Sequence, residues 1–253
     1  MSNLVPVSSA PAVPVAATVA LGDDVPSIEE LFLFAREAEL RVRSLRMDID
    51  EISMNARGED RVRHEVLLRH PDLARVNSLR SQDPLSNDYD IWIGRGDQVR
   101  SFSARHKLAS TRTRAAAVGG TDSPDLPAYA RSREPLTHLP PGSMADAFVH
   151  PHGLFRNVLV TGPLSIVGTR TINGREAIVV RAEHPRAAMV LVDRPDRSIE
   201  VGIDRTTALF LFPAEKNGDS VTHGVEVAST GLNSDIPDSA FELHLASDVR
   251  MIY

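Results

Sequence analysis

The stretch from residue 162 to 212 constrains the fold most, because strand-like segments alternate there with turn residues. The Asn-Gly pair at 173–174 stands between apolar, β-branched runs, and a type I′ hairpin turn needs φ > 0 at both central residues, which Asn and Gly tolerate. Ile199, Val201 and Ile203 then alternate with polar or small residues, so that one face of this strand is dry and the other wet. The sequence therefore predicts an antiparallel meander with one face in water.

Residues 27–103 add a helix and further strands. Ser27 with Glu30 three residues on matches a capping box, and apolar residues at helical spacing predict an amphipathic helix that ends near residue 43. From residue 44 the apolar period becomes two, and turn residues divide the segment into several strands. The apolar phase slips before Ile52, which predicts a β-bulge there.

Short helices and a second group of strands complete the order of elements. Residues 145–149 and 153–160 are predicted as two small helices broken at Pro151, and they precede the meander. Two more strands follow it, the last after a turn at residues 236–241. The elements are thus expected in the order helix, strands, small helices, strands. This order predicts an α+β fold with a long antiparallel sheet.

Composition and charge exclude several classes of protein. The formal net charge is −6, which disfavours a nucleic-acid binder because such proteins usually carry a basic surplus. There is no cysteine, so disulfides, thiolate catalysis and cysteine-ligated metals are excluded. No run of about 18 apolar residues occurs, so no integral membrane insertion is expected. Hydrophobic residues make up 42% and aromatic ones 5% of the chain, which predicts a sizeable, mostly aliphatic core.

The chain is predicted to form a single domain over residues 27–253, preceded by a disordered tail. Residues 1–26 are rich in Pro, Ala, Val and Ser, and no Lys or Arg precedes Arg36, so the basic region of a secretory signal is missing. We therefore expect a cytoplasmic location, with export as the alternative. Residues 104–134 lose periodicity and are predicted as a flexible insertion. The segment 95–114 carries six basic residues and one acid, and is either a solvated loop or an arm that meets an anionic ligand or partner.

No catalytic centre is evident in the sequence, and no cofactor or metal is predicted. His150-Pro151-His152, with His138 nearby, is one candidate metal pair, but a proline between two histidines does not give the helical spacing that brings two ligands together. No glycine-flanked serine motif, phosphate loop or dinucleotide fingerprint is present. Catalytic residues therefore stay unassigned.

Several short motifs carry a resemblance to a known family. They are the hairpin Val167–Ala177, the strand and turn Ser198–Thr207, and the late residues Asn233, Ile236, Pro237 and Phe241. Together with the helix at 27–43 and the strand at 69–76, they resemble the LolA-like superfamily over about residues 27–245. This group comprises the outer-membrane lipoprotein carriers, mycobacterial-type lipid-carrier lipoproteins and the sensor domain of periplasmic anti-sigma regulators. Two departures are the missing lipobox cysteine and Ala208, where the family carries glycine.

The resemblance implies a strongly curved antiparallel half-barrel, with an N-terminal helix and short lid helices at residues 143–160 over its concave face. Its interior would take acyl chains or other lipophilic groups, so the implied partner is a lipophilic small molecule. Alternation shows that the Ile199 face is dry and leaves open whether a ligand or the first helix covers it. The residues expected to line the cavity are Leu45, Met47, Ile49, Val66, Leu68, Trp92, Phe148, Leu154, Phe155, Ile199, Val201 and Ile203.

Three functions are compatible with this pattern. The first is a carrier or binding protein for a lipid or acyl-like molecule. The second is a cytoplasmic biosynthetic enzyme that uses the same cavity to fold and convert an apolar natural-product intermediate. Such an enzyme need leave no motif, because a cavity can catalyse by holding a flexible substrate in a reactive conformer. The third is a regulatory domain that binds a partner protein through residues 95–114.

Overall fold

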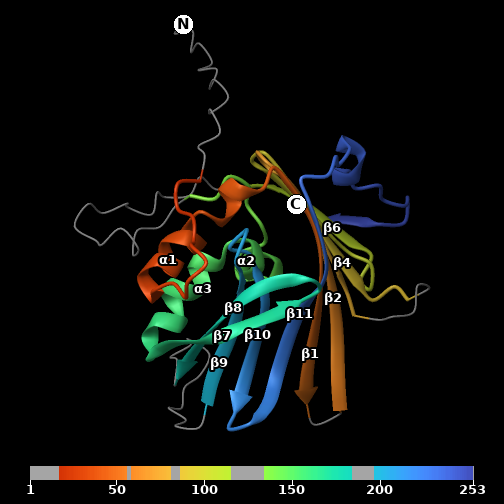
Figure 1. Cartoon of the computed structure of the whole chain (residues 1–253). Coiled ribbons are helices and arrows are strands. Elements are labelled where there is room, and N and C mark those ends of the chain that lie inside the picture. Colours follow the sequence, from red (N-terminus) through yellow and green to blue (C-terminus); the bar gives the residue numbers. More distant parts are fainter. Residues whose placement is uncertain (1–16, 56–57, 81–85, 115–133, 184–196, 253) are drawn as a thin grey trace, which may run out of the picture.

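The computed structural model describes residues 17–55, 58–80, 86–114, 134–183 and 197–252 (Figure 1). Within these residues the helical elements are α1 (Ile28–Arg36), η1 (Ala38–Arg41), α2 (Met144–Val149), α3 (Pro151–Asn157), η3 (Leu159–Thr161) and η4 (Asp238–Phe241), where η is a 3-10 helix. The strands are β1 (Ser44–Asn55), β2 (Gly58–Arg69), β3 (Leu73–Leu79), β4 (Tyr89–Arg95), β5 (Gln98–Ser103), β6 (Leu108–Thr113), β7 (Leu164–Ile172), β8 (Arg175–Glu183), β9 (Arg197–Asp204), β10 (Phe210–Asn217), β11 (Ser220–Leu232) and β12 (Arg250–Ile252).

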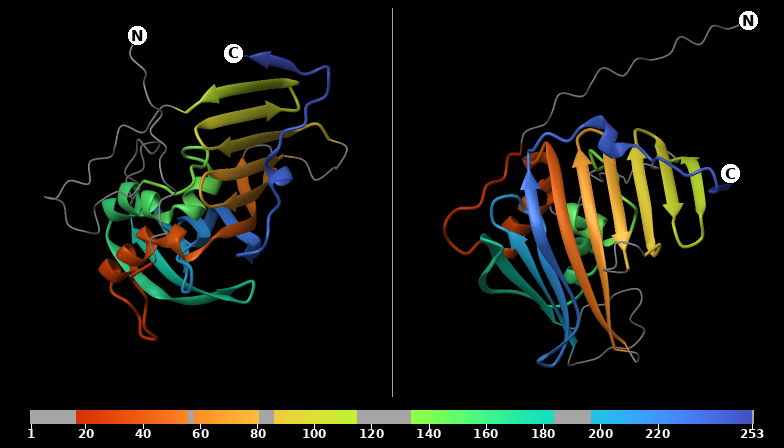
Figure 2. Two further views of the ribbon diagram at one scale, coloured as in Figure 1. Left: turned by 90° about the horizontal axis from the view of Figure 1, so that it is seen from above. Right: turned by 90° about the vertical axis from the view of Figure 1, so that its right-hand side faces the viewer.

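The strands form one open sheet in the order β12-β6-β5-β4-β3-β2-β1-β11-β10-β9-β8-β7. Neighbours are antiparallel, except that β12 runs parallel to β6. Two meanders, β1–β6 and β7–β11, are joined where β1 pairs with β11. The sheet is strongly curved, and α1, α2 and α3 lie on its concave side (Figures 1 and 2). The predicted α+β half-barrel with an N-terminal helix and short lid helices is confirmed.

Helix α1 begins where the sequence predicts and ends earlier. The Glu30 carboxylate accepts the Ser27 N–H at 2.7 Å, and the Ser27 hydroxyl accepts the Glu30 N–H at 3.2 Å. This capping box satisfies two backbone donors and contributes about 1 kcal/mol. The N–H of Glu37 bonds back to Phe34 O at 3.2 Å, which tightens the chain into η1. The helix predicted to run to residue 43 is therefore an α-helix followed by a separate 3-10 turn.

The core lies between the helices and the concave face, which is the face that carries Met47 and Val66, paired across β1 and β2. Helices α2 and α3 contribute Phe148 and Phe155, which are both fully buried. Their ring centroids lie 6.4 and 6.0 Å from that of Phe210 on β10. Aromatic pairs at such separations add about 0.5–1.5 kcal/mol each beyond area burial, so this cluster fixes the lid helices on the sheet.

The residues after β11 cross the opposite, convex face of the sheet (Figure 2). Arg75 on β3 donates to Ala240 O at 3.2 Å, and the Phe241 side chain is buried. At the start of the crossing, Asn233 Oδ1 accepts the Arg43 N–H at 2.6 Å. The late family motif therefore anchors the end of the chain to the start of β1.

Two local predictions are wrong. Strand β1 pairs with β2 without interruption from Ser44 to Asn55, so no bulge interrupts that pairing at Ile52. The register shift occurs instead between β1 and β11, where Ala228 is the extra residue. Within the predicted flexible insertion, Leu108–Thr113 forms β6, because it pairs with β5 along its whole length.

Other parts of these predictions lie outside the described residues, namely 1–16 of the predicted tail and 115–133 of the predicted insertion. Among the residues that the structure does describe, no helix is long and apolar enough to cross a membrane.

Candidate functional site

The structure brings the predicted cavity residues together in one apolar cluster. Trp92 and Leu154 are partly buried at its margin. Ile199, Val201 and Ile203, on the dry face of β9, belong to the same buried cluster as residues of the helices. Contact of these residues with a ligand stays a prediction. The buried members are Leu45, Met47, Ile49, Val66, Leu68, Phe148, Phe155, Ile199, Val201 and Ile203.

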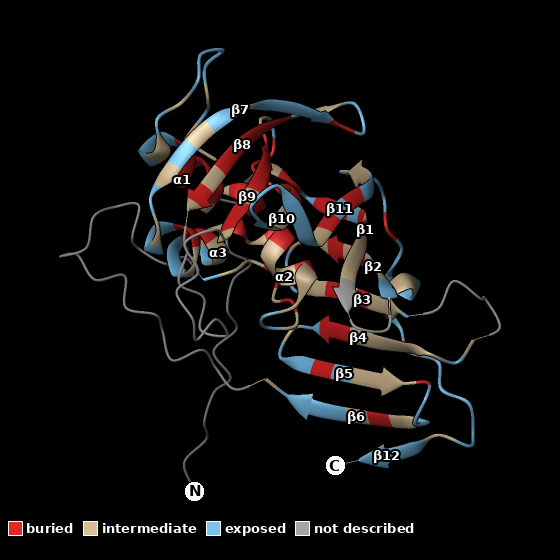
Figure 3. Cartoon of the chain, turned by 90° about the horizontal axis from the view of Figure 1, so that it is seen from below, coloured by how far each residue is buried: buried red, intermediate tan, exposed pale blue. Residues whose placement is uncertain are grey.

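The concave face stays open farther along the sheet, over β2 to β6. A pocket of about 610 Å³ lies there, between the strands and the start of α2, and we call it the concave pocket. Figure 3 shows β4, β5 and β6 as largely exposed or partly buried. Trp92 belongs both to this pocket and to the predicted cavity set. The apolar lining consists of Val76, Ile91, Trp92, Phe102, Leu108, Ala109, Pro140, Met144 and Ile252.

The orientation of Trp92 is set by its own strand. Trp92 pairs with Val76 across β3 and β4 and therefore lies on the concave face. A methyl group added at Gly94, two residues on and on the same face, would come within 2.6 Å of the indole. The benzene ring of the indole thus lies close to Gly94, and a larger residue there would displace it.

A row of polar side chains also lines the concave pocket. His64 on β2 is the cross-strand partner of Ser78 on β3, and Glu51 on β1 lies on the same face as buried Ile49. Ser78 Oγ lies 3.0 Å from His64 Nδ1, and His64 Nε2 lies 2.9 Å from Glu51 Oε2. His223 on β11 reaches the other carboxylate oxygen, with its Nε2 3.0 Å from Glu51 Oε1. Four strands therefore contribute to one hydrogen-bonded row.

The two histidines hold Glu51 in its ionised form. Hydrogen bonds from His223 and His64 lower the pKa of Glu51 to about 2, although burial alone would raise it. The same carboxylate raises the pKa of His223 by accepting its hydrogen bond. An ionised carboxylate only accepts hydrogen bonds, so the His64 Nε2 that faces it carries a hydrogen. In neutral His64, Nδ1 is therefore the acceptor that faces the Ser78 hydroxyl.

Sequence reasoning missed this row, although one signal of it was present. The apolar phase of β1 slips at Ile52 because Glu51, and not an apolar residue, occupies the concave face after Ile49. The strand itself continues, and Ile52 points to the convex face. A polar residue interrupting a dry face produces the same slip in apolar phase as a bulge. The histidine and serine partners come from other strands and left no local pattern.

His150 joins two carboxylates from different elements. Its Nδ1 lies 2.7 Å from Asp146 Oδ1 on α2, and its Nε2 lies 3.0 Å from Glu39 Oε1 on η1. Burial would lower the pKa of His150, but the two carboxylates outweigh that effect and raise the pKa to about 9. Pro151 begins α3. Within the described ranges, no group of three or more His, Asp or Glu side chains is placed to hold a metal ion.

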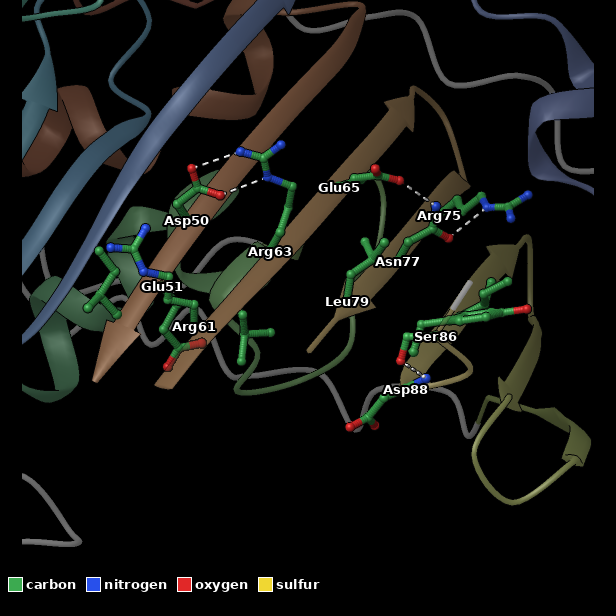
Figure 4. A pocket seen from close by; sticks show the side chains of 14 residues that line it. Asp50, Glu51, Arg61, Arg63, Glu65, Arg75, Asn77, Leu79, Ser86 and Asp88 are labelled. Atoms are coloured by element: carbon green, nitrogen blue, oxygen red, sulfur yellow. Dashed lines mark hydrogen bonds and ion pairs between the residues drawn. The ribbon is translucent and has the colours of Figure 1, made fainter. Parts of the chain in front are cut away.

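A second groove, of about 820 Å³, lies on the convex face over β1 to β4 (Figure 4). Asp50 and Arg63 form a two-pronged ion pair there, with N–O distances of 2.8 and 2.9 Å. Beside it, Asn77 donates to Glu65 and accepts from Arg75, each at 2.9 Å. These polar groups satisfy one another across the strands, so they stabilise the sheet and leave little charge to fix a ligand. Sequence reasoning did not single out this groove.

Asp204, within the second family motif, organises the turn before β10. The carboxylate is 1% exposed, and its Oδ1 accepts the N–H groups of Thr206 at 2.9 Å and Thr207 at 2.7 Å. Its Oδ2 lies 2.5 Å from Arg175 Nε. Ala208 has φ 64°, a left-handed conformation that favours glycine, as the family's residue at this place indicates. The motif therefore builds a turn.

The basic segment 95–114 forms the end of β4, strands β5 and β6, and the turns between them. Its role as an arm for a partner stays a prediction. Three of its cations pair with acids elsewhere in the chain: Arg95 with Asp238, Arg105 with Asp88, and Lys107 with Asp248.

Comparisons with known proteins give likenesses in structure. No protein-family model matches the chain, and no curated protein matches its sequence. The MucA/MucB complex of Pseudomonas aeruginosa is 14% identical with a TM-score of 0.49, covering 85% of this chain and 60% of that one. LprF from Mycobacterium bovis is 11% identical with a TM-score of 0.40, covering 83% and 95%.

A LolA superfamily protein, NE2245 from Nitrosomonas europaea, is 10% identical with a TM-score of 0.34, covering 87% of this chain and 99% of that one. Structures of the LolA-like superfamily are thus among those to which the chain is similar, as its motifs predict. These identities and TM-scores carry no conclusion about function, which has to be argued from the site.

Proposed function

We propose that this protein binds a neutral lipophilic ligand, with an acyl-like chain lying in the concave pocket. One observation carries the proposal: an apolar part of the concave face is left uncovered by the helices, and Trp92 lies in it. The volume of about 610 Å³ is within the range of about 300–1,000 Å³ that small-molecule sites span.

The lining favours a long apolar chain without a negative charge. Each buried CH₂ contributes about 0.8 kcal/mol, so a ~12-carbon chain gains about 10 kcal/mol before the entropy cost of binding. The acidic groups of the lining are Glu51 and Asp90. They would repel a free carboxylate, since like charges placed together across a contact are unfavourable. A neutral ester or alcohol meets no such penalty.

The test uses the fluorescence of Trp92, which is the single tryptophan of the chain. Titration with monododecanoyl glycerol is expected to shift the emission to shorter wavelength in a saturable way. An analogue with a nitroxide on the acyl chain is expected to quench the emission, because the chain would lie against the indole. Dodecanoate at neutral pH should bind more weakly than the ester.

Matched variants separate pocket binding from surface adsorption. Leu108→Glu places a charge in the lining and should weaken binding by about 10-fold or more, equivalent to about 1.4 kcal/mol. Val221→Glu changes a valine on β11 that is 51% exposed and outside the pocket, and should bind as the unaltered protein does. The proposal is refuted if the unaltered protein gives no saturable change, or if both variants weaken binding equally.

A further inference from the structure

The polar row has a geometry that ligand binding alone does not require. We propose that Ser78, His64 and Glu51 form a hydrolytic centre that cleaves an ester bound in the concave pocket. Ser78 is the nucleophile, His64 the general base and Glu51 the positioning residue. The inference rests on the proposed function, because the pocket has to hold the ester.

Three adjacent strands place the groups in the order that nucleophilic catalysis needs. The nucleophile contacts the base, with Ser78 Oγ 3.0 Å from His64 Nδ1. The base contacts its orienting group, with His64 Nε2 2.9 Å from Glu51 Oε2. A hydroxyl beside a base that is itself held by a third group is the general arrangement of an activated serine. Because the side chains stand on one face of a sheet, their spacing is fixed by the backbone.

The protons are also where the reaction needs them. Glu51 is ionised and keeps a hydrogen on His64 Nε2, which leaves the Nδ1 lone pair toward the Ser78 hydroxyl. Once His64 has taken the serine proton, the Glu51 carboxylate stabilises the resulting cation. His223 holds the second oxygen of Glu51 at 3.0 Å and so fixes the carboxylate from the other side.

An ion pair lies across the strand from the nucleophile. Asp90 is the cross-strand partner of Ser78, and Arg80 Nη1 lies 2.7 Å from Asp90 Oδ2. Arg80 thus fixes the Asp90 carboxylate across the strand from Ser78.

The chemical steps balance within the chain, the ester and water. Ser78 Oγ bonds to the carbonyl carbon while its proton passes to His64 Nδ1. The C–O bond to the alcohol then breaks, and the departing oxygen takes that proton from His64. A water oxygen next bonds to the acyl carbon, its proton passing through His64 to Ser78 Oγ as the acyl–serine bond breaks. The products are the alcohol, the carboxylic acid and the restored serine.

The substrate class follows from the position of the apolar lining. Val76 precedes Ser78 by two residues on the same face and pairs with Trp92. An acyl chain lying over these two side chains brings its carbonyl carbon toward Ser78. The centre therefore fits neutral esters of medium-chain or long-chain acids.

The first experiment uses the full chain with 4-nitrophenyl octanoate as substrate and a fluorophosphonate as a probe of the nucleophile. We expect hydrolysis above the buffer rate, and mass spectrometry should find the phosphonyl group on the peptide that contains Ser78. Ser78→Ala should lose both signals. Ser229→Ala removes another hydrogen-bonded serine, whose hydroxyl donates to Asp48 at 2.7 Å on the convex face, and should keep both.

The second experiment separates base and positioning roles. His64→Gln should lower the hydrolysis rate by about 10²–10⁴-fold. Glu51→Gln should lower kcat with little change in KM for the ester, because His64 loses the carboxylate that fixes its orientation. Glu51→Asp should restore part of kcat, because it keeps an ionised acceptor for His64. The ionisable groups around His64 are Glu51, with His223 behind it, and Asp90 with Arg80. A merely structural Glu51 would change KM and the free energy of unfolding together with kcat.

The outcomes distinguish the two proposals. If the ester changes the Trp92 fluorescence but Ser78 is neither labelled nor needed for hydrolysis, the hydrolytic centre is refuted and ligand binding stands. If no ester or alcohol changes the Trp92 fluorescence and no hydrolysis occurs, both proposals fail. Labelling of the unaltered protein tests the nucleophile even where a variant does not fold.

Discussion

His150→Gln is expected to destabilise the protein in a way that depends on pH. His150 is 15% exposed and bridges Asp146 on α2 and Glu39 on η1, at 2.7 and 3.0 Å. Glutamine keeps an N–H donor but carries no charge. The variant therefore removes the positive charge beside Glu39, whose side chain is 10% exposed. Losing one partner of a buried ion pair costs about 3–5 kcal/mol.

The size and sign of the pH effect follow from the raised pKa. The pKa of His150 rises from 6.5 to about 9, and one pKa unit corresponds to about 1.4 kcal/mol, so the charged form contributes about 3 kcal/mol. Because the folded-state pKa lies above the unfolded one, this contribution is fully present below about pH 6.5 and is lost as the pH rises through about 9. The neighbouring titratable groups are Glu39, Asp146, His70 and His138.

The measurement is urea unfolding of both proteins at pH 6.5, 8 and 10, followed by circular dichroism. The difference in free energy of unfolding should be about 3 kcal/mol at the lowest pH and should shrink toward zero at the highest. Taking the difference removes the contribution of other titrating groups. His244→Gln, at a histidine whose side chain is 83% exposed, should show little difference at any pH. A difference in free energy of unfolding for His150→Gln that stays constant from pH 6.5 to 10 would show that His150 is neutral in the fold.

Three further substitutions test the structural argument. Asp204→Ala should destabilise by about 3–5 kcal/mol, because it leaves Arg175 and two turn N–H groups without their acceptor, and thermal unfolding would show it. Gly94→Val should displace the Trp92 ring, change its emission and cost about 1–3 kcal/mol, whereas unchanged fluorescence would contradict the close approach. Gly153→Ala in α3 should stabilise by about 0.5–1 kcal/mol, since no atom lies within 4 Å of the added methyl, and a lower Tm would argue against that.

Elements with a strong local pattern could be predicted from the sequence. The capping box at Ser27 and the Asn-Gly turn at 173–174 occur where expected, because both are properties of a few adjacent residues. Strand β6 was missed because Leu108 and Ala109 are its only buried or partly buried apolar residues, and its stability comes from pairing with β5 on one side and β12 on the other. Pairing with a distant strand leaves no trace in a local window.

The candidate site could be predicted only in part for the same reason. Trp92 was singled out, and the apolar face around it follows from alternation. Glu51, His64 and His223 meet only because β1 lies between β2 and β11, an order that joins residues far apart in the chain. His150 was considered as a metal ligand from its own neighbours, whereas its partner Glu39 lies on a different element.

The concave pocket exists in part because the concave face of β5 and β6 carries small polar residues beside its apolar ones. On β1 and β9 this face carries large aliphatic residues that pack against the helices. On β5 and β6 it carries Ser101 and Ser110, whose hydroxyls lie 2.8 Å apart, where a core would need larger apolar residues. A hydroxyl pair satisfies its own polarity without filling the space above it, so the helices gain little by packing there and the volume stays open. Trp92, packed close to Gly94, keeps one wall of that volume apolar. The same sheet face is thus a core where its side chains are large and a binding surface where they are small.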